Sequence, residues 1–181
     1  MESDEALFER IRRGELAAFD ALYVRWERRL YGFIRGYLDD AAEAEDVFHE
    51  IFMAVLRAPA DFARGSFKAW VLQVARNACL NRLRSRRRGD AARARQAEDI
   101  ERVSLPVALD NIAGREARHA LDEAVARLPR NLGEVYRLRA NGLSYEEMAN
   151  VLDVPLGTVK SRMHEMVAQL KKEMQAWTAS E

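Results

Sequence analysis

One stretch constrains the fold of this chain more than any other, because residues 143–170 carry the start and stop signals of two short helices joined by a tight turn. Ser144 can cap the first helix, and Glu147 three residues later completes a capping box. Pro155 ends this helix, since proline forces the residue before it out of helical geometry. A second helix is predicted by apolar residues at spacings of four, three and four, which are Val159, Met163, Met166 and Leu170.

The side of the second helix opposite this apolar stripe carries small and polar side chains, with a cation on each edge of that face. Lys160 and Arg162 are the cations, and the residues between them around the helix are Gly157, Ser161, His164, Glu165 and Ala168. Such a face suits base edges that lie between two rows of phosphates. It also suits an ordinary solvated face of a helical hairpin, and periodicity alone does not separate the two interpretations.

The bulk composition indicates a folded protein without a membrane segment. The chain has 181 residues, 49% of them hydrophobic, which is enough for one domain or two small ones with packed cores. It lacks a run of about 18 apolar residues, and its N-terminus is amphipathic and acidic rather than a signal peptide. We therefore expect a cytoplasmic protein with no stable membrane insertion.

The residues that usually carry enzyme chemistry are scarce. Cys79 is the single cysteine, which excludes an internal disulfide framework and is expected to be a small buried residue. The three histidines, His49, His119 and His164, have no metal-ligand spacing. A helical enzyme with a hydrolytic or metal site is an alternative that no nucleophile motif supports. We expect no cofactor, no metal and no catalytic residue.

Charge is balanced overall but unevenly distributed. Lys plus Arg and Asp plus Glu number 29 each. Eight arginines lie between Arg76 and Arg95 against one acid, Asp90, whereas an acidic patch lies upstream at Asp39, Asp40, Glu43, Glu45, Asp46 and Glu50. This separation predicts two different partners, one polyanionic and one basic.

Helical periodicity recurs along the chain, and strand-like alternation does not, so the predicted class is all-α. Apolar spacings predict a short helix capped by Ser3, a long helix over 16–37 with a heavily aromatic buried face that begins at Leu16, a second long helix over 44–56, and a basic helix that follows Ser66. Residues 89–114 lose periodicity and are too long for an ordinary connection. We predict two small helical domains, 1–88 and 115–181, joined by a flexible linker over 89–114. Four helices are predicted in the second, one of them capped by Asn131.

Three segments in this order resemble the bacterial extracytoplasmic-function (ECF) sigma factors of the sigma-70 superfamily. They are AEDVFHEIFMAVL at 44–56, GSFKAWVLQVARNACLNRLRSRRR at 65–88, and LPRNLGEVYRLRANGLSYEEMANVLDVPLGTVKSR at 128–162. The resemblance covers nearly the whole chain except the linker. It implies a promoter-specificity subunit of RNA polymerase that has only the second and fourth conserved regions of the family.

The resemblance implies that helix 44–56 docks on the clamp helices of the largest catalytic subunit of core RNA polymerase. Asp46 and Glu50 are four residues apart and so share one helical face. His49 stands beside them where the family usually has Gln, so the detail of the contact at this position differs from that of the family. Without the neighbouring motifs, a solvated acidic face is the simpler interpretation of these residues.

Segment 65–88 resembles the part of the family that recognises and melts the promoter element near minus ten. A separated strand needs cations along its backbone and flat surfaces for unstacked bases. Trp70 fits core spacing better than a base-stacking role. The residues implied to contact minus-ten DNA are Pro59 and Phe62 in a loop over 58–66, with Lys68, Arg76, Asn77, Asn81, Arg84 and Arg87 on the helix.

The helix-turn-helix resembles the module that reads the minus-thirty-five element as duplex DNA. We expect Thr158 to bind phosphate through its hydroxyl and backbone N–H at the helix start. Asp153 stands where such turns often have Gly, but aspartate tolerates left-handed geometry comparatively well. The implied minus-thirty-five contacts are Thr158, Lys160, Ser161, Arg162, His164 and Glu165.

One alternative function is a free-standing helix-turn-helix regulator that binds operators as a homodimer through its N-terminal helices. It leaves the arginine-rich helix 76–88 and the acidic patch unexplained. The resemblance also implies an anti-sigma factor as a further partner, since such partners are common in the family.

Overall fold

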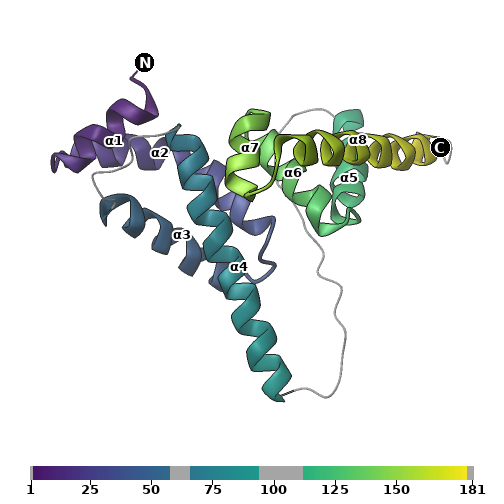
Figure 1. The fold of residues 1–181 in the computed structure, drawn as a ribbon, viewed down its shortest axis with the longest axis horizontal. Coiled ribbons are helices and arrows are strands. Elements are labelled where there is room, and N and C mark those ends of the chain that lie inside the picture. Colours follow the sequence, from purple (N-terminus) through teal and green to yellow (C-terminus); the bar gives the residue numbers. More distant parts are fainter. Residues whose placement is uncertain (1, 58–65, 94–111, 179–181) are drawn as a thin grey trace. The chain divides into compact units, whose positions relative to one another are not determined.

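In a computed structural model of the protein, residues 2–57, 66–93 and 112–178 are described, and the regular elements in these ranges are helices (Figure 1). They confirm the predicted all-α class. The chain divides into two compact units, Met1–Glu101 and Arg102–Glu181. The first unit holds α1 (Asp4–Arg12), α2 (Leu16–Arg35), α3 (Ala41–Arg57) and α4 (Phe67–Arg93), and the second holds α5 (Ile112–Ala126), α6 (Arg130–Ala140), α7 (Tyr145–Leu152) and α8 (Leu156–Thr178).

Helices in the first unit begin at the polar residues that the sequence offers as caps. Ser3 Oγ accepts a hydrogen bond from Ala6 N at 3.2 Å, and Ser66 Oγ accepts one from Ala69 N at 3.2 Å. Both caps were predicted. Each oxygen satisfies a backbone N–H that has no acceptor within its own helix.

The core of the first unit is aromatic, as the spacing over 16–37 predicted. Trp26 and Phe33 of α2 are almost fully buried, and Tyr23 lies against Phe52 of α3 with ring centroids 4.7 Å apart. Cys79 on α4 is fully buried, which confirms its expected place. Leu16 was predicted to face the core but is 74% exposed, because it is the first residue of α2 and extends past the packed part of the helix.

Helices extend into the predicted linker, residues 89–114, from both ends. Helix α4 continues to Arg93, and α5 begins at Ile112. Residues 94–111 lie outside the described residues. The basic helix is therefore longer than its apolar pattern indicated, since arginine is a good helix former even where no apolar residue marks the period.

In the second unit one predicted cap is wrong. Asn131 lies inside the first turn of α6, and the residue at the cap is Pro129, whose carbonyl oxygen accepts hydrogen bonds from Leu132 N and Gly133 N at 2.9 Å each. Proline has its φ angle fixed near the value that leads into a helix, and it needs no donor there. The other end of α6 closes at Gly142, which has a φ angle of 76°.

The core of the second unit contains two charged residues that sequence patterns did not predict to be buried. Glu134 and Arg137 of α6 are 6% and 4% exposed. The Arg137 guanidinium lies over Gly133, where an added Cβ atom would be 3.4 Å from its two terminal nitrogens, an ordinary van der Waals distance. The buried cation therefore packs directly on the first part of its own helix.

Candidate nucleic-acid and protein interfaces

Helix α3 has one buried and one exposed face, and the predicted protein-binding residues lie on the exposed one. Asp46, His49 and Glu50 are all exposed. The opposite face is buried through Ala44, Val47, Phe48, Ile51, Phe52 and Val55. The His49 ring packs on the edge of Phe48, with ring centroids 5.8 Å apart. The acidic face is thus carried by a helix whose orientation the core fixes.

The acidic and basic surfaces of the first unit are less separate than the charge pattern predicted. Asp46 Oδ2 lies 3.5 Å from Arg82 Nη2, and Glu43 Oε2 lies 3.6 Å from Arg86 Nη1. These pairs join α3 to α4. Sequence reasoning placed the four residues in two independent patches. The sequence signal for this pairing is the spacing. Glu43 and Asp46 are three residues apart on α3, and Arg82 and Arg86 are four apart on α4, so each helix presents its two charges on one face.

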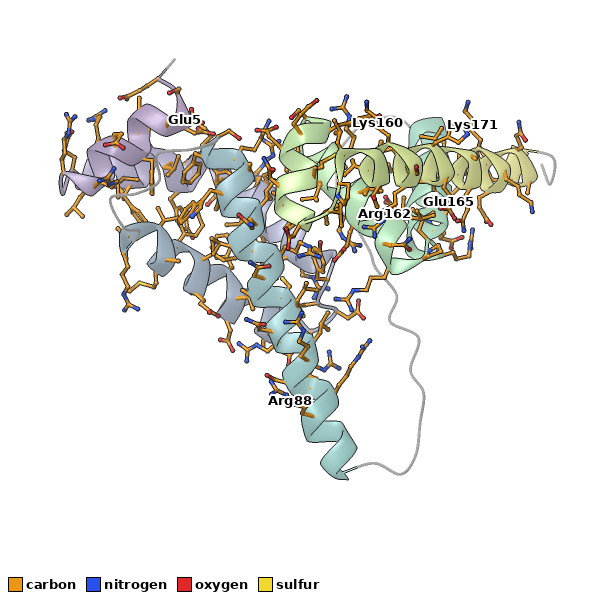
Figure 2. All side chains as sticks on the ribbon, in the orientation of Figure 1. Glu5, Arg88, Lys160, Arg162, Glu165 and Lys171 are labelled. Atoms are coloured by element: carbon orange, nitrogen blue, oxygen red, sulfur yellow. The ribbon has the colours of Figure 1, made fainter. Side chains whose placement is uncertain are left out.

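Helix α4 presents a continuous polar face. Asn77, Asn81, Arg84 and Arg88 follow one another at spacings of four, three and four, and all are exposed (Figure 2 labels Arg88). Asn81 Oδ1 accepts a hydrogen bond from Arg84 Nη1 at 3.1 Å. This face brings together amides that can read base edges and guanidinium groups that can bind phosphate.

The other predicted minus-ten residues differ in how far their side chains are exposed. Arg87 is exposed, whereas Lys68 and Arg76 are half-buried on α4. Pro59 and Phe62 lie outside the described residues.

Trp70 packs on the core of the first unit. It is half-buried, and its ring centroid lies 5.3 Å from that of Phe8 and 5.8 Å from that of Phe67. These contacts confirm the interpretation that its spacing belongs to the core.

The turn between α7 and α8 has the geometry that the sequence predicted. Glu147 N donates to Ser144 Oγ at 3.1 Å, and Ser144 N donates to Glu147 Oε2 at 2.7 Å, so the capping box is complete. Asp153 has φ 54° and ψ 51°, which is the left-handed conformation expected at this position. Helix α8 then begins directly after Pro155.

Helix α8 exposes the predicted nucleic-acid face. Lys160, Ser161, His164 and Glu165 are exposed and Arg162 is half-buried, while the predicted apolar stripe faces inward. Figure 2 labels Lys160, Arg162 and Glu165 on this helix. Of that stripe, the residues that are 7% exposed or less are Val159, Met163 and Met166. The Ser161 hydroxyl donates to the Gly157 carbonyl at 3.0 Å, so its oxygen remains available mainly as an acceptor.

Part of the role predicted for Thr158 is wrong. Its backbone N–H donates to the Pro155 carbonyl at 2.9 Å, because Pro155 stands at the start of α8 and its oxygen takes the first helical hydrogen bonds. This N–H is therefore not available for phosphate. The half-buried side chain keeps its hydroxyl as the group that can contact DNA.

Within residues 2–57, 66–93 and 112–178, no group of three or more His, Cys, Asp and Glu side chains is placed to hold a metal ion. Over the same residues, no helix combines the length and apolar character needed to span a bilayer.

Each unit matches a known protein family. Residues 22–89 match the model of sigma-70 region 2, and residues 118–170 match the model of sigma-70 region 4. The RNA polymerase sigma-H factor of Pseudomonas aeruginosa is 34% identical over 96% of this chain and 95% of its own length. The ECF RNA polymerase sigma-E factor of Escherichia coli K12 is 31% identical over 89% of this chain and 88% of its own. The chain is an ECF sigma factor of the sigma-70 family.

Solved structures agree with this fold. The sigma factor is similar to CnrH in complex with the cytosolic domain of CnrY, with a TM-score of 0.67, 24% identity, and coverage of 97% of this chain and 99% of that one. It is also similar to RpoE of Bartonella quintana in complex with the anti-sigma factor NepR, with a TM-score of 0.65, 20% identity, and coverage of 87% and 96%. The predicted function, direction of transcription initiation by RNA polymerase, is confirmed by the family. The free-standing homodimeric regulator is not favoured.

Proposed function

We propose that three exposed helix faces divide the work of this sigma factor. The α3 face with Asp46, His49 and Glu50 docks on the clamp helices of the largest catalytic subunit of core polymerase. The polar face of α4 recognises and melts the minus-ten element, and the outer face of α8 reads the minus-thirty-five element. The observation that carries the proposal is that each face is exposed while the other side of the same helix is packed in a core.

On the minus-ten element, the residues of α4 supply two kinds of contact. Asn77 and Asn81 hydrogen-bond base edges of the separated strand, and Arg84 and Arg87 bind its phosphates, with Arg76 and Lys68 beside them. The family resemblance adds Pro59 and Phe62 as the border of a pocket for an unstacked base.

On the minus-thirty-five element, α8 lies in the major groove. Lys160 and Arg162 bind phosphates or guanine, and His164 and Glu165 face the base edges. Ser161 acts as an acceptor, because its proton is already donated to Gly157. A cytosine or adenine amino group is the base donor that suits it.

The remaining parts of the proposal concern the chain as a whole. Region 2 occupies 1–88 and region 4 occupies 115–181, and the connection between them sets the distance between the two promoter elements. The protein makes and breaks no covalent bond itself and acts in the cytoplasm, where polymerase works. An anti-sigma factor is a further proposed partner, supported by the similar fold of the sigma factor crystallised with NepR. Purification of the chain from its own cells tests this, since a sequestering protein would accompany it in place of polymerase.

Transcription with purified core polymerase is the decisive experiment. Promoter-specific initiation by the chain and core enzyme alone is expected. Operator binding as a dimer, without association with polymerase, would instead support a free-standing regulator.

Charge reversal tests the docking face. Asp46→Arg with Glu50→Arg is expected to lower affinity for core polymerase by more than about tenfold, because like charges then face each other. Circular dichroism should show an unchanged fold. Asp20→Arg, a reversal at an exposed carboxylate on α2, is the matched control and should bind core normally. Unchanged polymerase affinity in the double variant would reject α3 as the docking surface.

Removal of two cations from α8 tests the groove face. Arg162→Ala should weaken duplex binding by about 1–3 kcal/mol and relax specificity at one base position if this residue reads a base. Lys160→Ala should weaken binding evenly across sequences and reduce its salt dependence, as expected for a phosphate contact. Undiminished affinity in both variants would show that another face of α8 enters the groove.

A further inference from the structure

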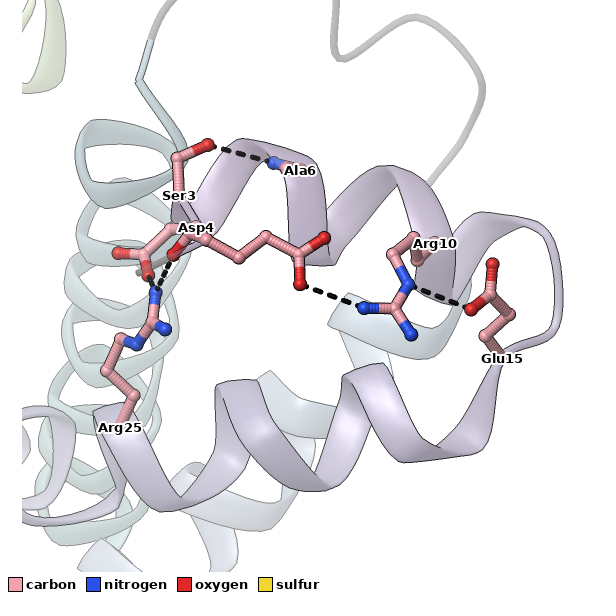
Figure 3. A network of polar contacts seen from close by, with 7 residues as sticks. Ser3, Asp4, Ala6, Arg10, Glu15 and Arg25 are labelled. Carbon is pink, nitrogen blue, oxygen red and sulfur yellow. Dashed lines mark hydrogen bonds and ion pairs between the residues drawn. The ribbon is translucent and has the colours of Figure 1, made fainter.

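Two adjacent acidic residues at the start of α1 contact two different helices. Asp4 Oδ2 accepts a hydrogen bond from the indole Nε1 of Trp26 on α2 at 3.0 Å. The other oxygen of Asp4 pairs with Arg25, as Figure 3 shows. Glu5, labelled in Figure 2, contacts α4 instead: its Oε1 accepts a hydrogen bond from the backbone N–H of Phe67 at 3.0 Å. The Glu5 contact joins residues that are 62 positions apart in the chain.

The Glu5 contact satisfies a backbone group that α4 cannot satisfy itself. Phe67 is the first residue of α4, and the first N–H groups of a helix have no acceptor within it. The hydroxyl of Ser66, the neighbouring residue, accepts from a different backbone group, Ala69 N. A carboxylate at this end of a helix is also favoured by the helix dipole. Glu5 is therefore a cap for α4 that comes from another helix.

Aromatic packing holds the same junction from the apolar side. The Phe67 ring is fully buried, with its centroid 5.2 Å from that of Phe8 on α1 and 5.6 Å from that of Trp26 on α2. Phe8 lies three residues after Glu5, so both side chains leave α1 on neighbouring turns of one face. Helix α1 thus holds the first turn of α4 through the Glu5 carboxylate and through the Phe8 ring, which lies against both Phe67 and Trp70.

The match to sigma-70 region 2 begins at residue 22 and does not include α1. Yet α4 carries most of the proposed minus-ten residues, and Lys68, the first of them on this helix, directly follows Phe67. We infer that Glu5 is a positioning residue for minus-ten recognition: by capping Phe67 N it fixes the rotation of the first turn of α4, and through it the setting of the DNA-facing side chains. This inference rests on the role proposed above for α4.

The test uses the full-length chain with core polymerase and a promoter fragment from which the wild-type holoenzyme initiates. Open-complex formation is compared on this fragment and on the same fragment with its minus-ten element substituted, which gives a discrimination ratio. Affinity for core polymerase is measured in parallel. The variants are Glu5→Ala, which removes the acceptor, and Glu5→Gln, which keeps an amide oxygen in its place.

Glu5→Ala is expected to lower the discrimination ratio by roughly fivefold, the scale of one helix cap, with core affinity unchanged. Glu5→Gln should restore the ratio. The matched control is Glu9→Ala, which removes an exposed α1 carboxylate that lies 2.7 Å from Arg12 Nη1 on the same helix, and it should leave the ratio at the wild-type value. If Glu5→Ala proves unfolded by circular dichroism, Glu5→Asp, one methylene shorter, carries the same expected loss.

Two outcomes would overturn the inference. The first is a lower thermal midpoint for Glu5→Ala with a normal discrimination ratio, which would make α1 a stabilising helix only. The second is a loss that Glu5→Gln does not restore. Neither outcome affects the proposed function, which fails separately if the wild-type chain does not direct initiation by core polymerase.

Discussion

The two units of this sigma factor fix their helix ends in different ways. In the second unit the helix ends around α7 are held by local contacts: Ser144 and Glu147 cap α7 across three residues, and Arg139 Nη1 donates to the Leu143 carbonyl at 2.9 Å. In the first unit the start of α4 is capped by Glu5, 62 positions away. The Asp46–Arg82 pair likewise joins different helices.

This difference shows what orients α4 and α8, the two helices proposed to read DNA. The turn before α8 is specified by residues next to it, so the helix-turn-helix carries its own geometry wherever the unit is placed. The first turn of α4 has a local cap at Ser66 but is also held by Glu5 of α1 and by aromatic contacts with α1 and α2, so the minus-ten recognition proposed for α4 depends in part on residues of other helices. Changes at long-range contacts should therefore disturb the first unit widely, whereas changes at local contacts should stay local.

The largest expected effect comes from the aromatic junction of the first unit. Phe67→Ala should destabilise this unit by about 3–5 kcal/mol, because it empties a fully buried site between Phe8 and Trp26. Hydrogen exchange measured along the chain should show faster exchange in α1, α2 and α4, with the second unit unchanged.

Leu16→Ala is the matched control for this core deletion, since Leu16 is apolar but 74% exposed on α2. It should shift stability by less than about 0.5 kcal/mol. Protection lost equally in both units of Phe67→Ala would mean that they unfold together and that the contrast between them does not hold.

A smaller effect is expected from the local cap in the second unit. Ser144→Ala should destabilise this unit by about 1 kcal/mol, because Glu147 N loses its acceptor and the capping box is broken. Denaturant unfolding followed by hydrogen exchange in α7 measures it. Ser161→Ala, also an exposed serine but within α8, should not destabilise the unit, since alanine is the better helix former. Exchange that accelerates in α1 or α4 of Ser144→Ala would contradict a purely local effect.

The same contrast explains what the sequence could predict. The capping box at Ser144, the left-handed Asp153 and the exposed face of α8 were predicted correctly, because each depends on residues a few positions apart. The Glu5 cap was not predicted, since no local pattern links a glutamate on one helix to the backbone of another. The exposed Leu16 was missed for the same reason: periodicity gives the face of a helix but not where its neighbour ends.

The ion pair between α3 and α4 should contribute less than either change above. Asp46→Asn should destabilise the first unit by less than about 1 kcal/mol, because both side chains are partly exposed. The difference from wild type should fade as salt is raised, since screening weakens the attraction to Arg82. Denaturation midpoints at low and high salt measure it, with Glu45→Gln on the same helix as control. A difference that persists in high salt would indicate packing rather than charge.

The smallest effect is expected from a local carboxylate in the second unit, and it depends on pH. Burial raises the pKa of Asp122 above its ordinary 3.8, although Arg118, whose Nε lies 3.7 Å from the carboxylate, and His119 oppose the shift. The folded state then binds the proton more tightly than the unfolded chain, so this group makes the unit less stable as pH rises from below 3.8 through the raised pKa.

Asp122→Asn should remove this pH dependence, whereas Glu116→Gln, at an exposed position of α5, should not. Unfolding midpoints of the second unit across acidic pH measure it: the stability of wild type relative to Asp122→Asn should decline as pH rises. A relative stability that grows instead would mean that the Arg118 attraction outweighs burial, and that this local ion pair stabilises its unit more than desolvation opposes it.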